Sequence, residues 1–512
     1  MRVLNPLVHE TLRGTLQPIG YSVCSSNGQP VEVLQYRNLK YGHISKRFDR
    51  STEANGYRGE TLDCTAWGPR CPQNSVDVGS LLRIPKRIRQ VVPEQEDEFD
   101  CLNLAVTLPE KAAGNSKQGL PVVVWIPGGS QTVSFVSAAS EVCDPSLLVA
   151  DAAQASKPCI FVFLNYRLNI FGFGNLDGES YNLGLLDQQV AINWVRTHIA
   201  SFGGDPRNIT VAGESAGAFC THAHTLLYPK GTIRRAILQS GHLWTSPPQP
   251  LSRGQALIET IRDRIAVVAS KYALEDLPVD QLLQILKDLQ IKSVWNHEQH
   301  DLEGWEHRVP NVEAILVGDC EYEASLFAYN MATCSPENII SAFKDLEMSE
   351  ELLSSYHIEI DRPSASIIGA LDILADVRFS WSGQRAAEMW KAQTKVIKYT
   401  FDEPNPWQPS ARAHHAVDLL FLFGTYQDHF PEHAARLSVK MRQHWIDFVT
   451  SDSPRDLEDL VFGPHGTVEK AQPDCIAVRR RSEAWQTLDK IGYASLNKLA
   501  GTLGLNKISL DT

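Results

Sequence analysis

The sequence lacks any long apolar run: no window holds the roughly 18 consecutive apolar residues that a membrane-spanning helix needs. The first six residues, Met-Arg-Val-Leu-Asn-Pro, begin no apolar stretch of the kind found in a secretory signal. Cysteine is scarce as well, with 10 residues in 512, which argues against a fold stabilised by many disulfides. These absences lead us to expect a cytoplasmic protein without a membrane span.

Basic residues are in the minority. The chain has 48 Lys and Arg against 60 Asp and Glu, which gives a formal net charge of −12 at pH 7. Binding of nucleic acid requires a basic footprint for the phosphates, so we expect no nucleic-acid partner. Two short basic clusters, at residues 86–89 and 479–481, are expected to be solvated faces of the surface.

The spacings of the cysteines match no zinc site, and we find no motif for an organic cofactor. We therefore expect neither a metal nor a cofactor. Nothing in the sequence specifies an oligomeric state.

The chain does contain short apolar runs that alternate with amphipathic segments. Runs typical of buried strands lie at residues 122–126, 159–164, 209–212, 236–239, 314–317 and 396–400. Apolar residues at helical spacing lie between some of these runs, for example at residues 185–199. This alternation predicts an α/β fold with a large, mostly parallel central sheet flanked by helices on both faces.

The domain organisation follows from the same pattern. Length alone suggests about three domains, but α/β enzymes of this size often form one. We expect a single domain over residues 1–512. Two helical blocks, at about residues 250–310 and 335–393, interrupt the alternation and are expected to form a cap or a pocket wall. Residues 49–78, rich in Gly, Pro, Asn and Cys, are expected to form a long surface loop.

One apolar run leads directly into a candidate catalytic turn. Residues 209–212 (Ile-Thr-Val-Ala) precede Gly-Glu-Ser-Ala-Gly at residues 213–217, which fits the G-x-S-x-G pattern of a nucleophile elbow. The glycines allow other backbone to approach the serine closely. A helix that begins after Ser215 would aim its first N–H groups at the site, so the N–H of Ala216 is a candidate oxyanion donor.

A serine hydroxyl needs a general base, and the base needs a carboxylate that orients it. On this type of fold the chain order is Ser, acid, His, with each partner in a loop after a strand. His415 has the expected position, and its neighbour His414 is the rival. The acid should follow the run at residues 314–317, where three carboxylates compete, and spacing does not choose among them: Asp319, Glu321 and Glu323.

At this point the chain resembles the type-B carboxylesterase and cholinesterase family of α/β-hydrolases, in particular its fungal esterase branch. Phe-Gly-Gly-Asp-Pro at residues 202–206 and Gly-Glu-Ser-Ala-Gly at residues 213–217 match family motifs without change. Residues 98–104 and 182–188 resemble two further family segments. The resemblance implies an α/β-hydrolase fold and a catalytic triad of Ser215, Glu323 and His415.

The resemblance also implies the residues of the oxyanion hole. The family's donors map to Gly129, Ser130 and Ala216, in a turn that here reads Pro-Gly-Gly-Ser at residues 127–130. The family usually has three glycines at this turn. If the turn requires a positive φ at Ser130, the side chain adds a strain of about 1–3 kcal/mol.

A second departure concerns redox chemistry. Cys71 and Cys101 match positions that form a disulfide in secreted relatives. The resemblance therefore implies a possible bridge between these two residues. A cytosolic setting would instead keep both thiols reduced.

The leading hypothesis is a serine carboxylic-ester hydrolase that acts through an acyl-serine intermediate. Its expected substrate is a small-molecule ester or lactone, intracellular or from secondary metabolism. An acyltransferase or a lactone-forming cyclase would use the same triad, because an alcohol and water attack the same intermediate. A non-catalytic binding protein of cholinesterase type is the alternative from another class, and the retention of Ser215, Glu323 and His415 counts against it.

Overall fold

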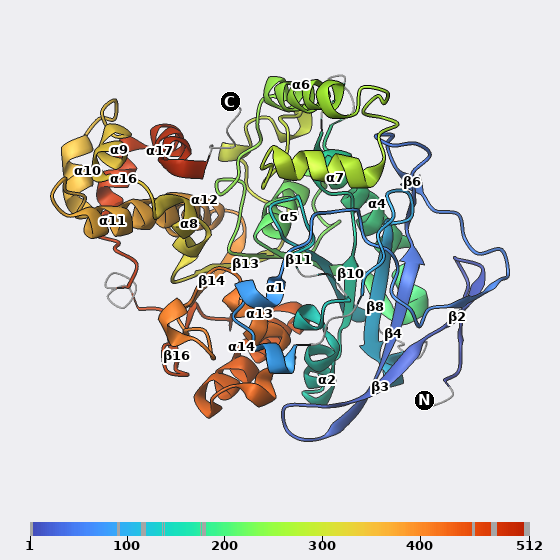
Figure 1. The fold of residues 1–512 in the computed structure, drawn as a ribbon. Helices are drawn as coiled ribbons and strands as arrows, with labels where there is room; N and C mark the ends of the chain where they lie inside the picture. The colour runs from blue at the N-terminus through green and yellow to red at the C-terminus, as the bar shows by residue number, and fades with distance from the viewer. Residues whose placement is uncertain are drawn as a thin grey trace.

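An 11-stranded sheet forms the centre of the molecule (Figure 1). The computed structural model describes residues 4–505, apart from residues 90–92, 114–118, 136, 138, 175, 177–180, 453–455 and 473–478. The strands of the central sheet are β3 (Ile19–Cys24), β4 (Pro30–Lys40), β8 (Asn103–Pro109), β9 (Leu120–Ile126), β10 (Ile160–Leu164), β11 (Gly204–Glu214), β12 (Arg235–Gln239), β13 (Ala314–Cys320), β14 (Lys395–Phe401), β15 (Leu460–Phe462) and β16 (Val468–Lys470). Their spatial order is β16-β15-β14-β13-β12-β11-β9-β10-β8-β4-β3.

The middle of this sheet is parallel and its two edges are antiparallel. The strands from β10 through β9, β11, β12, β13 and β14 to β15 pair in parallel. At one edge β8, β4 and β3 pair antiparallel, and at the other β16 pairs antiparallel with β15. The antiparallel edge strands β3 and β4 are joined by a short turn, whereas parallel neighbours need long crossovers. The predicted α/β fold is confirmed, with a mixed sheet.

Side chains of successive residues in the strands enter opposite cores. In β9, Val122 and Val124 belong to one core cluster, and Val123 and Trp125 belong to the other. The first core is covered by α4 (Leu183–His198) and α5 (Ala216–Leu227). The helices over the second core are α2 (Ser146–Gln154), α13 (Val417–Phe423) and α14 (Glu432–Thr450). Figure 1 shows these two sets of helices on opposite faces of the sheet.

The two expected helical blocks are present and differ in how they pack. In the first block, α6 (Leu251–Val268) and α7 (Val279–Asp288) join the core of α4 and α5. The second block surrounds a third core that it shares with two helices near the C-terminus, α16 and α17 (Figure 1). These helices are α8 (Ala328–Met331), α9 (Pro336–Ser341), α10 (Ser349–Ser355), α11 (Pro363–Ala375), the π-helical η8 (Asp376–Ser380), α12 (Trp381–Trp390), α16 (Trp485–Ile491) and α17 (Tyr493–Ala500).

The remaining elements are short. The long loop expected at residues 49–78 contains two short strands, and each of them pairs with a strand earlier in the chain. The small sheets consist of β1 (Leu7–His9), β2 (Gly14–Gln17) and β7 (Thr61–Asp63), and of β5 (Gly42–His43) and β6 (Thr52–Glu53). The short helices are α1 (Val78–Leu81), α3 (Asn169–Phe173), η1 (Lys86–Ile88), η2 (Glu110–Ala112), η3 (Glu141–Cys143), η4 (Ile199–Phe202), η5 (His300–Leu302), η6 (Trp305–His307), η7 (Glu323–Leu326), η9 (Pro409–Ala411), η10 (Gln427–His429) and η12 (Gly501–Leu505).

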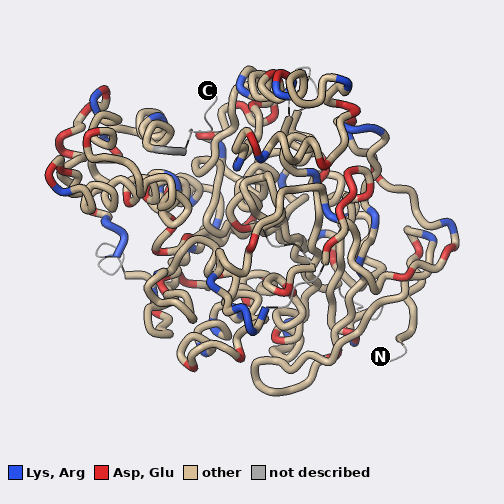
Figure 2. The backbone as a smooth tube through the Cα atoms, viewed as in Figure 1, with Lys and Arg blue, Asp and Glu red and all other residues tan. Residues whose placement is uncertain are grey.

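Charged residues of both signs are interspersed over the molecule. Figure 2 shows basic and acidic segments scattered along the backbone, with uncharged stretches between them. Within the described residues, no helix has the length and the apolar character needed to cross a membrane.

Candidate active site

The strand β11 ends at Glu214 and the helix α5 begins at Ala216, so that Ser215 alone makes the turn. Ser215 has φ 53° and ψ −120°, a conformation that a non-glycine residue rarely adopts. A Cβ on Gly217 would lie 2.0 Å from the carbonyl oxygen of Ile126 on β9, so this position has room only for glycine. The strained serine at the carboxyl end of a central strand is the geometry of a nucleophile elbow.

His415 and Glu323 meet beside this elbow. Nδ1 of His415 lies 2.5 Å from Oε2 of Glu323, and Oε1 of Glu323 accepts a hydrogen bond of 2.7 Å from the backbone N–H of Cys320. The Glu323 side chain is fully buried. Burial alone would raise its pKa, but the charge of His415 and these hydrogen bonds hold the pKa below its usual value. Glu323 is therefore an ionised partner that orients the imidazole.

The rivals for these two roles have other partners. His414 Nε2 lies 3.0 Å from Asn405 Nδ2, and burial lowers the pKa of His414 to about 4. Glu321 forms an ion pair with Arg412. Asp319 forms an ion pair with the buried Arg480. Glu323 and His415, two of the three residues that the resemblance implied, are thus in contact beside the elbow that carries Ser215.

A further carboxylate, which the sequence reasoning missed, also contacts the imidazole. Oε1 of Glu214 lies 3.1 Å from Nε2 of His415, and its side chain is 2% exposed. Burial raises the pKa of Glu214 to about 8. Burial also favours the neutral form of His415, but Glu214 and Glu323 outweigh it and raise the pKa of His415 to about 9. The available signal was the position of Glu214, which directly precedes the candidate nucleophile.

The predicted oxyanion turn lies opposite the elbow. Gly129 has φ 118°, and a Cβ there would lie 2.1 Å from the carbonyl oxygen of Val133. Ser130 has φ 55° and Gln131 has φ 60°, so two consecutive residues with side chains adopt the left-handed conformation. The positive φ at Ser130 that the sequence left conditional is therefore present, at a cost of about 1–3 kcal/mol. The backbone N–H of Ser130 is retained, as an oxyanion donor requires.

The elbow, the acid, the imidazole and the glycine turn have the arrangement of a serine hydrolase on an α/β sheet. A model of the carboxylesterase family matches residues 7–491, nearly the whole chain. The chain belongs to the carboxylesterase family.

Several relatives of this carboxylesterase are known. Lipase 3 of Yarrowia lipolytica (strain CLIB 122 / E 150) is 28% identical over 505 residues, which cover 95% of this chain and 99% of the lipase. The para-nitrobenzyl esterase of Bacillus subtilis (strain 168) is 30% identical and the match covers 77% of this chain and 81% of the esterase. A solved structure of a PNB esterase has a TM-score of 0.70 at 25% identity, with 93% of this chain and 99% of that chain covered. Family and relatives together make this protein a carboxylic-ester hydrolase.

The active site of this carboxylesterase opens into a cavity of about 520 Å³. Gly129, Ser130, Glu214, Ser215 and His415 lie along it. Seven of its fourteen other wall residues are apolar, and most of the wall surface is apolar. These seven residues come from the N-terminal loop and α1, from the segment after the oxyanion turn, from α7 and the loop after it, and from η7: Val76, Leu81, Val133, Phe135, Leu286, Ile291 and Leu326. Residues of the first helical block thus form part of the cavity wall.

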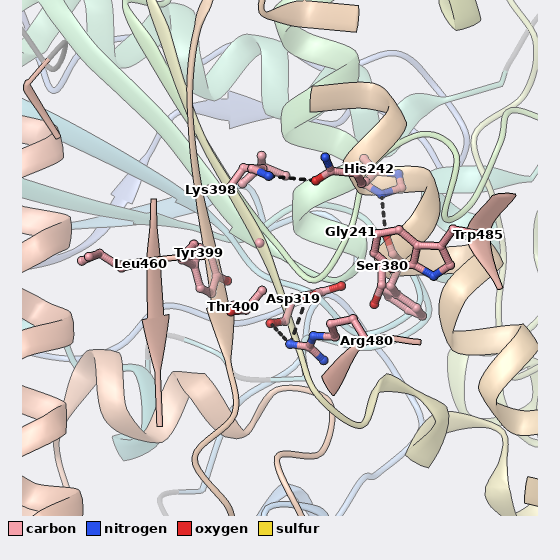
Figure 3. A pocket seen from close by; sticks show the side chains of 16 residues that line it. Gly241, His242, Asp319, Ser380, Lys398, Tyr399, Thr400, Leu460, Arg480 and Trp485 are labelled. Carbon is pink, nitrogen blue, oxygen red and sulfur yellow. Dashed lines mark hydrogen bonds and ion pairs between the residues drawn. The ribbon is translucent and has the colours of Figure 1, made fainter. Parts of the chain in front are cut away.

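The second helical block does not line this cavity, in contrast to the expectation for both blocks. The reason is that its helices pack around their own core, beside the sheet. The block nevertheless contacts the site, because the ring centroids of Phe379 and His415 lie 5.7 Å apart. A smaller cavity of about 60 Å³ lies between the second block and the ends of β13 and β14, and Figure 3 shows it from close by.

This smaller cavity contradicts one expectation from the sequence. Arg480 was expected on a solvated face, but its side chain is 2% exposed and lines the cavity (Figure 3). Its guanidinium lies 3.3 Å from Asp319 and 3.0 Å from Asp402, and donates a hydrogen bond of 3.0 Å to the carbonyl oxygen of Cys320. Burial raises the pKa of Asp319 to about 6, although Arg480 opposes this shift. These long-range partners explain why Arg480 is buried within a run of three arginines, whereas Lys86 and Arg87 of the other basic cluster are exposed.

The disulfide left as a possibility between Cys71 and Cys101 is not formed, and both residues have free, buried thiols. The Cys71 thiol, which hydrogen-bonds to Cys101, raises the pKa of Cys101 well above its usual value, and burial adds to the shift. Cys71 also accepts a hydrogen bond of 3.3 Å from the backbone N–H of Leu168. The two thiols thus serve as packed core residues in this structure.

Proposed function

We propose that Ser215, His415 and Glu323 hydrolyse carboxylic esters through an acyl-serine intermediate. The observation that carries this proposal is the 2.5 Å contact between His415 and Glu323 beside a serine in the strained elbow conformation. An imidazole held in this way is oriented to act as a general base. Both Ser215 and His415 line the same cavity.

In the first half of the reaction, Oγ of Ser215 attacks the acyl carbon while Nε2 of His415 accepts the hydroxyl proton. Glu323 stabilises the imidazolium that forms. The N–H groups of Gly129, Ser130 and Ala216 donate to the tetrahedral oxyanion. His415 then gives its proton to the leaving alcohol, and an acyl-serine remains.

In the second half, water attacks the acyl-serine and His415 again accepts a proton. The acid is released when His415 returns this proton to Oγ of Ser215. In the structure Nε2 of His415 lies next to Glu214. A catalytic cycle therefore requires this nitrogen to exchange its contact with Glu214 for one with Ser215.

The cavity supports a substrate with apolar acyl or alcohol groups. Its size is typical of sites for small molecules, and its walls are mainly apolar. The relatives named lipase and para-nitrobenzyl esterase support the same class of substrate. We extend the proposal to an ester or lactone of secondary metabolism, acted on inside the cell, and screening of such compounds together with cell fractionation tests these two parts.

A fluorophosphonate probe tests the assignment of Ser215. The wild type should be labelled and the Ser215→Ala variant should not, and the wild type should hydrolyse at least one member of a panel of short and bulky esters. Equal labelling of both proteins would contradict the proposal. Product analysis with an added alcohol separates hydrolysis from acyl transfer, since formation of the free acid alone indicates a hydrolase.

A further inference from the structure

The oxyanion turn is attached to the first helical block by a buried pair of amide side chains. Nε2 of Gln131 donates a hydrogen bond of 2.8 Å to Oδ1 of Asn296, although 165 residues separate them in the chain. Both residues are almost fully buried, with 0% and 1% exposure. This bond links the turn next to Ser130 with the loop that follows α7.

Backbone contacts join the same two segments. The N–H of Val294 donates to the carbonyl oxygen of Ser130 at 3.2 Å, and the hydroxyl of Thr132 donates to the carbonyl oxygen of Lys292 at 3.3 Å. On its other side, the turn receives a hydrogen bond of 2.7 Å from the N–H of Asn169 to the carbonyl oxygen of Gln131. The left-handed conformation of two successive residues is thus maintained by partners outside the turn.

The loop that holds the turn is itself anchored. The carbonyl oxygen of Asn296 accepts a hydrogen bond of 2.8 Å from the N–H of Gln249. The N–H of His297 donates to Oδ1 of Asn182 at 2.7 Å, and Nδ2 of Asn182 donates back to the carbonyl oxygen of His297 at 2.9 Å. These hydrogen bonds fix the backbone at Asn296 and His297. The bond from Gln131 to Asn296 therefore holds the oxyanion turn in a defined position.

The chemistry of the pair indicates a positional role. Oε1 of Gln131 and Nδ2 of Asn296 are buried and have no hydrogen-bond partner. Two apolar side chains of the same shape would avoid that desolvation penalty. The hydrogen bond between Gln131 and Asn296 is present in spite of this penalty. Its direction helps to hold the turn in its unfavourable left-handed conformation.

We propose that Gln131 and Asn296 are positioning residues that hold the N–H groups of Gly129 and Ser130 toward the oxyanion, so that the first helical block sets the geometry of the oxyanion hole. This inference rests on the proposed ester hydrolysis at Ser215. Neither residue touches the substrate. Loss of the bond should therefore weaken stabilisation of the transition state more than binding of the substrate.

The test uses the full chain, a p-nitrophenyl ester and the variants Gln131→Met and Asn296→Leu. One oxyanion donor is worth about 10²–10³ in rate, so partial misplacement should lower kcat by about 10–100-fold. KM should change by less than about threefold, because ground-state binding is unaffected. Affinity for a trifluoromethyl ketone, which forms an oxyanion on the serine, should fall in parallel with kcat.

Two further variants separate position from stability. The double variant Gln131→Met/Asn296→Leu replaces both partners by apolar groups, so its thermal stability should recover while its kcat stays low. Gln35→Leu is the matched control, because Gln35 is an equally buried amide that bonds to Asp144 and Ser146 and not to the turn. Its kcat should stay within about threefold of the wild type.

Recovery of kcat together with stability in the double variant would overturn the inference, as would an unchanged kcat and ketone affinity in the single variants. In both cases an active wild type would leave the proposed function intact. A wild type that neither hydrolyses esters nor reacts with the fluorophosphonate probe would instead contradict the proposed function and the inference together.

Discussion

Nε2 of His415, the nitrogen that must accept the proton of Ser215, lies 3.1 Å from Oε1 of Glu214. The same ring is held from its other side by Glu323 at 2.5 Å. The imidazole is thus placed between two buried carboxylates, and both favour its protonated form.

This relationship predicts a rising limb at alkaline pH in the pH dependence of activity. The pKa of His415 is raised to about 9, so the fraction in the neutral, basic form grows as the pH rises toward that value. The kcat/KM for an uncharged ester should therefore increase between pH 7 and pH 9, as measured in a series of buffers of constant ionic strength.

Glu214→Gln should move this limb to lower pH, because removal of the negative charge destabilises the imidazolium. Glu321→Gln is the control, since Glu321 pairs with Arg412 and not with His415. A limb that has the same midpoint in wild type and Glu214→Gln would contradict the assignment.

The orienting role of Glu323 predicts a large loss on neutralisation. Glu323→Gln keeps the size of the side chain but cannot stabilise the imidazolium, so kcat should fall by about 10³–10⁴-fold. Initial rates with a p-nitrophenyl ester measure this loss. A loss below about tenfold would show that another carboxylate orients His415.

Ser130 offers a matched pair of substitutions at the oxyanion turn. Ser130→Gly keeps the N–H and relieves the positive φ, so kcat should stay within about threefold of the wild type. Ser130→Pro removes the donor and cannot adopt φ 55°, and its kcat should fall by about 10²–10³-fold. Thermal unfolding curves show whether each variant is folded. Full activity in a folded Ser130→Pro variant would exclude Ser130 as a donor.

The buried guanidinium of Arg480 predicts an effect on stability. Arg480→Met would leave the carboxylates of Asp319 and Asp402 without their buried partner. The free energy of unfolding should fall by about 3–5 kcal/mol, measured by urea denaturation. The control Arg87→Met, at an exposed position, should change it by less than about 0.5 kcal/mol. Equal effects of both substitutions would contradict a structural role for Arg480.

Features with a local sequence signal could be predicted well. The strand and elbow around Ser215 are contiguous in the chain, so their residues appear as one motif. His415 and Glu323 lie far from it, and local reasoning left each with rivals until the resemblance selected them. The α/β class followed from apolar runs alone, but the antiparallel edges of the sheet did not.

Features built from distant residues could not be predicted. The burial of Arg480 depends on Asp319 and Asp402, which reach it only in the folded chain. The bond between Gln131 and Asn296 spans 165 residues, and amides of this kind are common on surfaces. Glu214 had a position that could have revealed it, since a residue next to an elbow serine shares its buried edge of the sheet.

The most direct test of the central claim is to map the acyl group after turnover is stopped. The protein is mixed with a p-nitrophenyl ester, quenched in acid within the burst phase, digested and analysed by mass spectrometry. We predict one acyl group per chain, on the peptide that contains Ser215, and none in Ser215→Ala. An acyl group found on another residue, or undiminished turnover by the Ser215→Ala variant, would contradict the account.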